Sequence, residues 1–395
     1  MTAASVSPLP SPSPSARVGD GVASIETPAL VIDLDAMRRN IERMAAFARD
    51  HRLALRPHAK THKSAAIARL QIAAGAVGVC VQKLSEAEAL AAAGIDDIFI
   101  SNQVIAPTKL ARLVALARRT TLAVAVDSTF GIERLVEAWR AGAVDGRSVD
   151  LGVFVEIDVG QGRCGVAPAA AVGLAHQIVA HGLHGLHFAG LQAYHGKAQH
   201  LRGAHEREAA VRHAASCVRA ALAGITSAGI RCPRVTGGGT GSFGFDAASG
   251  VYGELQPGSY VFMDRDYADN QAPEGAAFGP RFEPALFVKS QVISRGLSHA
   301  VVDAGHKAHA IDSGPPQVWQ RELVFTNGGD EHGILQPRPG ATADALPQLG
   351  DTVWLLPGHC DPTVNLHDRY VVVRGGLEGG TVDAMWPVDA RGCLA

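Results

Sequence analysis

The sequence predicts a TIM-type (β/α)8 barrel followed by a C-terminal mostly-β domain. Short apolar runs alternate with helical patterns about eight times over roughly 240 residues, which is the count and length of such a barrel. Several helical patterns end in a glycine, namely Gly75, Gly94 and Gly142, as expected for a helix C-cap. After about residue 275 the pattern changes to short apolar runs set between Gly, Pro and Asp, which is typical of β structure. A doubly wound open sheet is the structural alternative for the first part.

The individual elements follow from apolar periodicity. The run Ala29–Asp33 indicates a buried strand, and Met37, Ile41 and Met44 follow it at helical spacing, so we expect this run to be the first barrel strand. The other expected barrel strands are Leu53–Lys60, Val77–Gln82, Asp97–Asn102, Thr121–Asp127, Leu151–Asp158, His187–His195 and Arg234–Gly237. In the second domain the expected strands are Ala285–Ser294, Ala300–Ala304, Thr352–Leu356, Tyr370–Val373 and Val382–Trp386.

The chain divides into three parts. Residues 1–25 are rich in Pro, Ser and Ala, and the prolines of Ser7–Pro14 exclude a helix or a central strand there, so we expect a disordered leader. Residues 26–275 are expected to form the barrel, and residues 276–395 the β domain.

Charge and cysteine content exclude several classes of protein. Lys plus Arg (36) nearly balance Asp plus Glu (38), and a net charge of −2 gives no electrostatic case for nucleic acid or an anionic membrane surface. No apolar run reaches the roughly 18 residues of a membrane span, and the N-terminus lacks the pattern of a signal peptide. The six cysteines show no CxxC spacing, so we expect no disulfide framework or zinc ribbon, and a cytoplasmic location.

One lysine stands where a barrel carries its chemistry. The stretch Arg56–Lys63 follows an apolar run and precedes a helical pattern, which places Lys60 at the C-terminal end of a predicted strand. A lysine there can form a Schiff base, and pyridoxal phosphate is the cofactor that most often requires one. The alternative is a solvated basic loop.

A glycine-rich segment follows a late predicted strand. In Thr236–Ser242, glycines allow backbone N–H groups to close around an anion, and the hydroxyls of Thr240 and Ser242 add donors. Barrels commonly bind phosphate after a late strand, so this segment is a candidate phosphate site. It is neither a dinucleotide-binding fingerprint nor a P-loop, and an ordinary glycine-rich turn is the alternative.

Two further strand ends carry polar residues. In Asp158–Gly165, two glycines and Arg163 could hold a phenolate oxygen or a substrate carboxylate, although a lone arginine in a turn is usually a surface charge. In Gln192–Gly196, His195 is a candidate general base because an imidazole titrates near neutral pH. The chain contains 17 histidines, so most of them must have other roles.

A His-x-Asp pair near the C-terminus is a candidate metal site. Because residues i and i+2 of an extended backbone point the same way, His359 and Asp361 could both reach one divalent ion while Cys360 points elsewhere. Imidazole plus carboxylate suits Mn²⁺, Mg²⁺ or Zn²⁺, with water or substrate in the open positions. In isolation such a pair more often binds no metal.

These motifs occur together, and in this order, in one group of enzymes. The sequence resembles the D-threonine aldolase and D-serine dehydratase group, which are fold-type III pyridoxal phosphate enzymes related to the alanine racemase barrel. The resemblance covers nearly the whole chain after the leader. The matching segments are Thr27–Val31, Arg56–Lys63, Val79–Glu86, Asp158–Gly165, Gly190–Gly196, Thr236–Ser242, Glu254–Tyr260, Asp330–Gly333 and His359–Asp368.

The resemblance implies a role for each candidate residue. Lys60 would form the Schiff base, His195 would act as the base, and His359 with Asp361 would bind the metal. Gln256 falls where alanine racemases place an arginine against the pyridine nitrogen, so the electron-withdrawing behaviour of the cofactor would be tuned differently. Besides Lys60, the residues expected to bind the cofactor are Arg163 at the phenolate oxygen, Thr236, Gly238, Gly239, Thr240, Gly241 and Ser242 around the phosphate, and Tyr194, Gln256 and Tyr260.

The resemblance also implies the reaction. The substrate would be a D-β-hydroxy-α-amino acid such as D-threonine, cleaved to glycine and an aldehyde by a homodimer with its active sites at the subunit interface. By this resemblance, dehydratases of the group would have His-x-Cys at the metal motif and aldolases His-x-Asp. This chain has Asp361, which favours the aldolase. The alternatives are a D-serine or 3-hydroxy-D-aspartate dehydratase, and a β-hydroxyaspartate aldolase that forms glycine and glyoxylate. A non-catalytic pyridoxal phosphate carrier is a further alternative, but such carriers lack a β domain.

Overall fold

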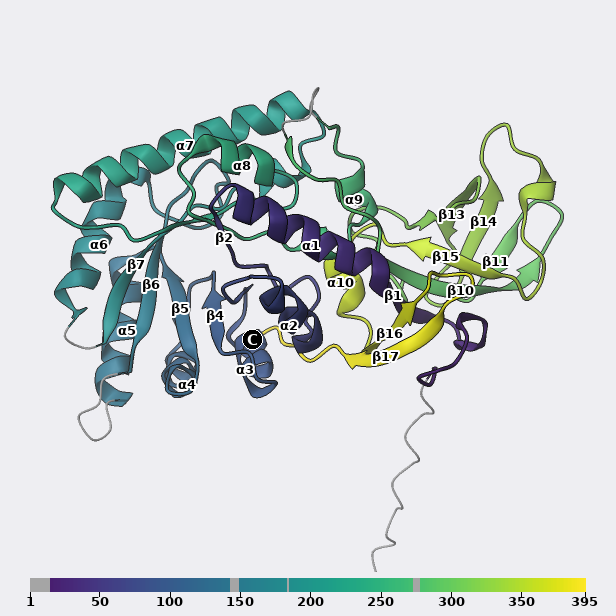
Figure 1. Cartoon of the computed structure of the whole chain (residues 1–395), viewed down its shortest axis with the longest axis horizontal. Coiled ribbons are helices and arrows are strands. Elements are labelled where there is room, and N and C mark those ends of the chain that lie inside the picture. The colour runs from purple at the N-terminus through teal and green to yellow at the C-terminus, as the bar shows by residue number, and fades with distance from the viewer. Residues whose placement is uncertain (1–14, 143–148, 183–184, 273–277) are drawn as a thin grey trace, which may run out of the picture.

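The computed structural model describes residues 15–142, 149–182, 185–272 and 278–395, and these form a parallel barrel beside a mostly antiparallel β domain (Figure 1). The barrel sheet has eight strands in the order β2-β9-β8-β7-β6-β5-β4-β3. The second sheet has nine strands, seven of them in the order β13-β14-β11-β10-β1-β16-β17, with β15 on β10 and β12 on β15. The prediction of a barrel plus a C-terminal mostly-β domain is therefore confirmed.

The barrel strands are buried along most of their length, and helices lie outside them (Figure 1). The strands are β2 (Ala54–Leu55), β3 (Val79–Val81), β4 (Asp97–Ile100), β5 (Thr121–Val126), β6 (Leu151–Glu156), β7 (Leu186–Gln192), β8 (Val235–Gly237) and β9 (Glu254–Leu255). The helices of this part are α2 (Ala65–Ala73), α3 (Leu84–Ala92), α4 (Pro107–Ala117), α5 (Thr129–Gly142), α6 (Ala171–Ala180), α7 (Ala204–Ser227), α8 (Phe243–Ser249) and α9 (Arg265–Ala268).

The barrel closes immediately before Lys60. An isolated parallel bridge joins His58 to Cys80 of β3, which links the two outermost strands of the sheet order. Cys80 N–H donates to the Pro57 carbonyl (2.8 Å), and Ala59 N–H donates to the Cys80 carbonyl (2.7 Å). The main chain that leads into Lys60 is thus fixed by ladder hydrogen bonds on the β3 side.

The expected first barrel strand belongs to the other sheet. Ala29–Asp33 forms β1, which pairs antiparallel with β10 (Leu286–Arg295) and parallel with β16 (Arg369–Arg374). The eighth barrel strand is instead Glu254–Leu255, which pairs with both β2 and β8. The prediction was wrong because an unbroken apolar run specifies a buried strand but not its partner, and a strand of two residues leaves no periodic signal.

The β domain is built on β10, the longest strand of its sheet. The remaining elements are β11 (Ala300–Val302), β12 (Gln317–Val318), β13 (Leu323–Asn327), β14 (Gly333–Pro337), β15 (Thr352–Leu356), the short helix α10 (Cys360–Val364) and β17 (Thr381–Pro387). Helix α1 (Leu34–Asp50) leads from β1 back to β2 and lies between the two parts (Figure 1). Asn40 on this helix donates to the Glu283 carbonyl (2.7 Å), and Asn40 Oδ1 accepts from Glu283 N–H (2.8 Å), which secures the start of the β domain against α1.

Part of the expected leader is ordered. Residues 1–14 lie outside the described residues, but Val22 and Ile25 are buried against the β domain. The ammonium of Lys289 donates to the carbonyls of Val22, Ala23 and Ile25 (2.7–3.2 Å) and so ties this segment to β10. The expected disorder of residues 15–25 is therefore corrected, because their carbonyls and apolar side chains have partners far along the chain. The expected boundary at residue 275 lies outside the described residues, and among the described helices none could span a membrane.

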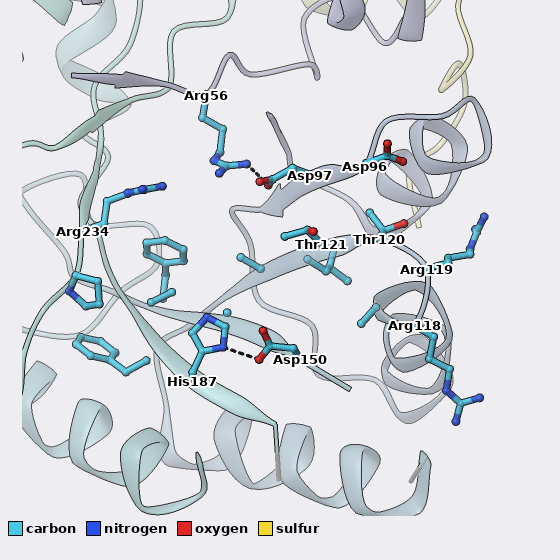
Figure 2. Close-up of a pocket in the computed structure, with 18 residues that line it drawn as sticks. Arg56, Asp96, Asp97, Arg118, Arg119, Thr120, Thr121, Asp150, His187 and Arg234 are labelled. Atoms are coloured by element: carbon cyan, nitrogen blue, oxygen red, sulfur yellow. Dashed lines mark hydrogen bonds and ion pairs between the residues drawn. The ribbon is translucent and has the colours of Figure 1, made fainter. Parts of the chain in front are cut away.

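A cavity of about 590 Å³ opens at the N-terminal end of the barrel, opposite the end that carries Lys60 (Figure 2). Arg56 reaches across it to Asp97 (2.5 Å) and to fully buried Glu254 (3.2 Å), which also accepts from Arg234 (2.8 Å). Burial alone would lower the pKa of Arg56, but the charges of Glu254 and Asp97 raise it. The charges of Arg56, Arg234, Asp97 and Glu254 thus compensate one another, and we infer that this network stabilises the barrel.

We expect Glu254→Ala to destabilise the protein by about 3–5 kcal/mol, because it leaves the buried Arg56 guanidinium without its main partner. Urea denaturation of the two proteins measures the difference. The matched control is Glu283→Ala, since Glu283 also accepts from two arginines but its side chain is partly exposed (36%), and its loss should cost about 0–1 kcal/mol. Equal effects of the two substitutions would show that the buried ion pair contributes no more than a surface pair.

Candidate active site

Lys60 and Asp361 meet at the C-terminal end of the barrel. Lys60 lies in the turn that follows the His58–Cys80 bridge, and its Nζ donates to Asp361 Oδ2 in an ion pair. The two residues are 301 positions apart and come from the barrel and the β domain respectively. The structure thus places the expected Schiff-base lysine beside the expected metal motif.

The ion pair governs the protonation of both groups. Burial alone would lower the pKa of Lys60, but the negative charge of Asp361 outweighs it and raises that pKa to about 12. Burial would raise the pKa of Asp361, but the charges of Lys60 and His359 lower it to about 2. By contrast, the neighbouring Lys63 is buried in an ion pair with Glu86 (2.7 Å), away from this end of the site. Of these two lysines, Lys60 is therefore the one that faces the metal motif.

The His-x-Asp pair converges, although not for the reason that the sequence suggested. Cys360–Val364 is the short helix α10, and His359 is its N-cap in an extended conformation, so the expected extended backbone at Asp361 was wrong. His359 Nε2 nevertheless lies 4.0 Å from Asp361 Oδ1. Cys360 points away, as expected, into the apolar core of the β domain, where burial raises the pKa of its thiol well above the ordinary value.

The donor atoms of this pair fit a divalent metal. Asp361 Oδ1 is buried and has no hydrogen-bond partner among the described residues, an arrangement that is costly unless a ligand is bound. His359 Nδ1–H donates to Asp312 Oδ2 (2.7 Å), which leaves Nε2 free to bind an ion. In the described part of the chain, no group of three or more His, Cys, Asp or Glu side chains is arranged to hold a metal.

The glycine-rich segment forms a tight loop between β8 and α8. Gln199, on the 3-10 helix η4 (Lys197–His200), bonds the loop twice: its Oε1 accepts from Gly241 N–H (2.9 Å) and its Nε2 donates to Ser242 Oγ (2.7 Å). A Cβ atom on Gly241 would lie 2.4 Å from the main-chain carbonyl oxygen of Gln199, so only glycine fits there, and a Cβ on Gly239 would displace the Gln199 side-chain amide. Gln199 was not predicted, and no motif in the sequence marks it.

The loop carries the groups that a phosphate site requires. Its consecutive glycines place backbone N–H groups at the end of a strand, and Thr240 and Ser242 add hydroxyls. Within the loop, Gly241 N–H is bonded to Gln199, and Gly239 N–H bonds to Ser242 Oγ (3.4 Å). Beneath it, Ser242 Oγ donates to Asp246 Oδ2 (2.6 Å), and burial raises the pKa of Asp246 to about 7. Tyr260 supports the loop from behind, because its N–H donates to Thr240 Oγ1 (3.0 Å) while its hydroxyl bonds to Gln71. The direct contact expected between Tyr260 and the cofactor stays a prediction.

Gln256 belongs to a buried amide network inside the barrel. Its Nε2 donates to Gln192 Oε1 (2.9 Å) and to Thr236 Oγ1 (2.8 Å), and Thr236 in turn donates to Glu254 Oε1 (2.8 Å). The side chain at this position is therefore neutral and is held by neutral partners. A pyridine nitrogen placed against it would gain no positive charge from the protein.

Tyr194 and Arg163 lie near Lys60. Burial raises the pKa of Tyr194, and the charges of Lys60 and Arg163 oppose this shift. Lys60 and Arg163 also help to lower the pKa of His58 well below its ordinary value, although burial is the larger cause, so His58 is neutral. His58, which was not predicted as a site residue, lies between two neighbours: its Nδ1 is 3.4 Å from the Lys60 main-chain nitrogen, and its Nε2 is 3.0 Å from the Gln82 side-chain amide. A neutral imidazole accepts at only one of these two nitrogens.

His195, the next residue after Tyr194, packs near Asp158 and His213. Burial lowers the pKa of His195, Asp158 raises it, and His213 lowers it further. A Cβ on Gly160 would lie 3.2 Å from His195 Nε2, so the ring packs against the Asp158–Gly165 segment. The structure thus joins His195 to one predicted motif, and its role as a base stays a prediction.

A closed parallel barrel with a lysine at its C-terminal end, joined to a β domain, defines an alanine racemase-like protein. Residues 32–266 match the family described as "Alanine racemase, N-terminal domain", and residues 285–373 match a "Putative serine dehydratase domain". The chain belongs to this family and, within it, to the D-threonine aldolase and D-serine dehydratase group, as its similarity to characterised relatives shows.

Three relatives illustrate the similarity. The chain is 47% identical over 383 residues to a D-threonine aldolase of Arthrobacter sp, covering 96% of each chain. It is 42% identical over 373 residues to a 3-hydroxy-D-aspartate aldolase of Paracoccus denitrificans (strain Pd 1222), covering 93% of this chain and 92% of the relative. The crystal structure of D-threonine aldolase from Filomicrobium marinum matches with a TM-score of 0.91 at 46% identity, covering 96% of this chain and all of the other (100%).

Proposed function

We propose that this chain is a carbon–carbon lyase that cleaves D-β-hydroxy-α-amino acids, D-threonine among them, to glycine and an aldehyde, using pyridoxal phosphate and a divalent metal. The observation that carries the proposal is the contact between Lys60 and Asp361, which puts a Schiff-base lysine and a hard oxygen ligand in one site. Similarity to a D-threonine aldolase along nearly the whole chain supports the same reaction.

The cofactor would be held by Lys60, by the loop Thr236–Ser242 at its phosphate, and by Arg163, Tyr194 and Gln256 around its ring. When bound, pyridoxal phosphate takes up the substrate amino group and withdraws electrons from Cα. Gln256 then offers an amide rather than a cation to the pyridine nitrogen, because its partners are neutral. Tyr260 would act through the loop that it supports.

The metal would be held by His359 Nε2 and Asp361 Oδ1, with Mn²⁺ or Mg²⁺ preferred over Zn²⁺ because of the carboxylate oxygen. Such an ion supplies Lewis acidity to the β-hydroxyl of the substrate. Asp361 also holds Lys60, so one residue of the β domain orients two reacting groups. His195 is proposed as the base that accepts the β-hydroxyl proton, and cleavage of the Cα–Cβ bond then releases the aldehyde.

The balance between aldol cleavage and dehydration depends on the metal ligand. A thiolate in place of Asp361 would favour zinc and elimination, but the cysteine within this motif, Cys360, is buried and points into the core. A second candidate function is cleavage of 3-hydroxyaspartate to glycine and glyoxylate, which the 42% identity to a 3-hydroxy-D-aspartate aldolase favours. Dehydration is the third candidate function, since the chain is 34% identical to a D-threo-3-hydroxyaspartate dehydratase of Delftia sp. (strain HT23).

We further propose that the protein is a homodimer in the cytoplasm and that it binds neither nucleic acid nor membrane.

The purified protein, supplied with pyridoxal phosphate and Mn²⁺, should convert D-threonine to glycine and acetaldehyde in equal amounts and leave L-threonine unchanged. Glycine, acetaldehyde, 2-oxobutyrate and ammonia are quantified in the same reaction. Stoichiometric ammonia from D-threonine or D-serine would show that the enzyme is a dehydratase and not an aldolase. A strong preference for 3-hydroxyaspartate, with glyoxylate as the product, would confirm aldol cleavage but assign a different substrate.

A further inference from the structure

We propose that Asp312 is a positioning residue of the metal centre, which fixes the tautomer and the orientation of His359 so that Nε2 faces Asp361. This inference rests on the proposed metal site. Asp312 lies between β11 and β12, outside every motif found in the sequence, and it is not one of the proposed ligands.

The hydrogen bond to Asp312 determines which nitrogen of His359 can bind a metal. His359 Nδ1 lies 2.7 Å from Asp312 Oδ2. An ionised carboxylate can only accept a hydrogen bond, so Nδ1 must carry the proton. Nε2 then presents its lone pair, and it does so toward Asp361 Oδ1, 4.0 Å away.

The segment that carries Asp312 is fixed against helix α10 by a second contact. Thr363 Oγ1, on α10, accepts from Ala310 N–H (3.0 Å) and donates to the His359 carbonyl (2.7 Å). One buried hydroxyl therefore connects the main chain two residues before Asp312 to the main chain of His359 itself. This connection sets the distance between the two side chains.

The main chain after Asp312 also contacts the segment that precedes His359. A Cβ on Gly358 would lie 2.4 Å from the Gly314 carbonyl oxygen, so the two main-chain segments touch at these positions. Arg265 joins both segments: its Nη1 donates to the Pro315 carbonyl (3.0 Å), and its main-chain N–H donates to the Pro357 carbonyl (3.1 Å). Asp312 is half-exposed, yet its backbone is held on both sides, so its contact with His359 is built into the fold.

The Asp312 carboxylate acts on His359 mainly by orienting the imidazole ring. The Asp312 side chain is 52% exposed, so solvent screens its charge, and Ser313 Oγ donates weakly to the same oxygen (3.3 Å). Groups that orient a metal-binding histidine typically change metal affinity 10- to 100-fold when they are removed. An effect of this size is measurable by direct binding.

The test is Mn²⁺ binding to the cofactor-loaded, metal-stripped protein, followed by the electron paramagnetic resonance signal of free Mn²⁺. We expect the dissociation constant of Asp312→Ala to be about 10- to 100-fold higher than that of the unmodified protein. Asp312→Asn should show a smaller increase, because an amide oxygen can still accept from Nδ1. The absorbance spectrum of the bound cofactor and the thermal midpoint should stay unchanged in both variants.

The chain offers a matched control. His187 Nδ1 bonds Asp150 Oδ1 (2.9 Å) at the other end of the barrel (Figure 2), so Asp150→Ala removes the same kind of pair and should leave Mn²⁺ binding unchanged. Equal Mn²⁺ affinity in Asp312→Ala and the unmodified protein would overturn the inference while the metal site stands. No Mn²⁺ binding by the unmodified protein would overturn both the metal site and the inference.

Discussion

Replacing Lys60 by alanine should reduce turnover of D-threonine by roughly ten-thousandfold or more, equivalent to about 5 kcal/mol of activation free energy. Lys60 is the lysine that the fold places beside the metal motif, and no nearby amine can replace it without rearrangement. Lys63 is buried against Glu86, and Lys83 lies at the start of α3, after the neighbouring strand β3. The fold should persist because Lys60 lies in a turn, with some loss of stability because the Asp361 carboxylate loses its ion-pair partner.

Covalent labelling identifies the reactive lysine independently of activity. Borohydride should fix the cofactor on the peptide that contains Lys60, and Lys60→Ala should lose this label while the phosphate loop still retains some cofactor. Lys83→Ala is the control, and it should keep both label and activity. Label found on Lys63 or Lys83 in the unmodified protein would refute the assignment.

Replacing Asp361 by asparagine should reduce aldolase turnover with Mn²⁺ by roughly a thousandfold, or about 4 kcal/mol. The substitution preserves the shape of the side chain but removes the charge that binds the metal and that holds the Lys60 ammonium. Chelation of the metal should cause a comparable loss, while the far-UV circular dichroism spectrum and the cofactor absorbance persist. An open site with two protein ligands contributes little to folding, in contrast to closed four-ligand sites.

Two variants test the argument about the ligand. Cys360→Ala should keep its turnover per folded molecule and lose some stability, since Cys360 fills part of the β-domain core. A large loss of turnover in Cys360→Ala would show that the ligand position was assigned one residue too late. Asp361→Cys should lose Mn²⁺-dependent aldolase activity, and any dehydration that it gains should depend on zinc.

The barrel could be predicted from the sequence because its pattern is local. Each expected strand from Leu53 to Gly237 contains an observed strand or its greater part, since a buried parallel strand is an unbroken apolar run bounded by turn residues. Lys60 was found for the same reason, as a reactive side chain at the end of such a run. The assignment of Ala29–Asp33 to the barrel was wrong because strand pairing is decided by distant segments.

The rest of the site depends on short or distant features. Helix α10 has five residues, too few for apolar periodicity, and its proline sits in the first turn, where a helix tolerates it. Gln199 and Asp312 act on residues 42 and 47 positions away, on Gly241 and His359 respectively. No spacing rule connects side chains at such separations, so only the folded structure reveals them.

The place of β1 has a consequence for how the chain reaches its final form. Strand β1, the first in the described part of the chain, lies in the middle of the β-domain sheet, between β10 and β16. Both of its neighbours follow the entire barrel in the sequence, so β1 must wait for them while the barrel strands pair one after another. The metal motif lies between β15, which pairs with β10, and β16, which pairs with β1, so it is held from both sides only when β1 is in the sheet. Assembly of the site is therefore a late event that requires both ends of the polypeptide.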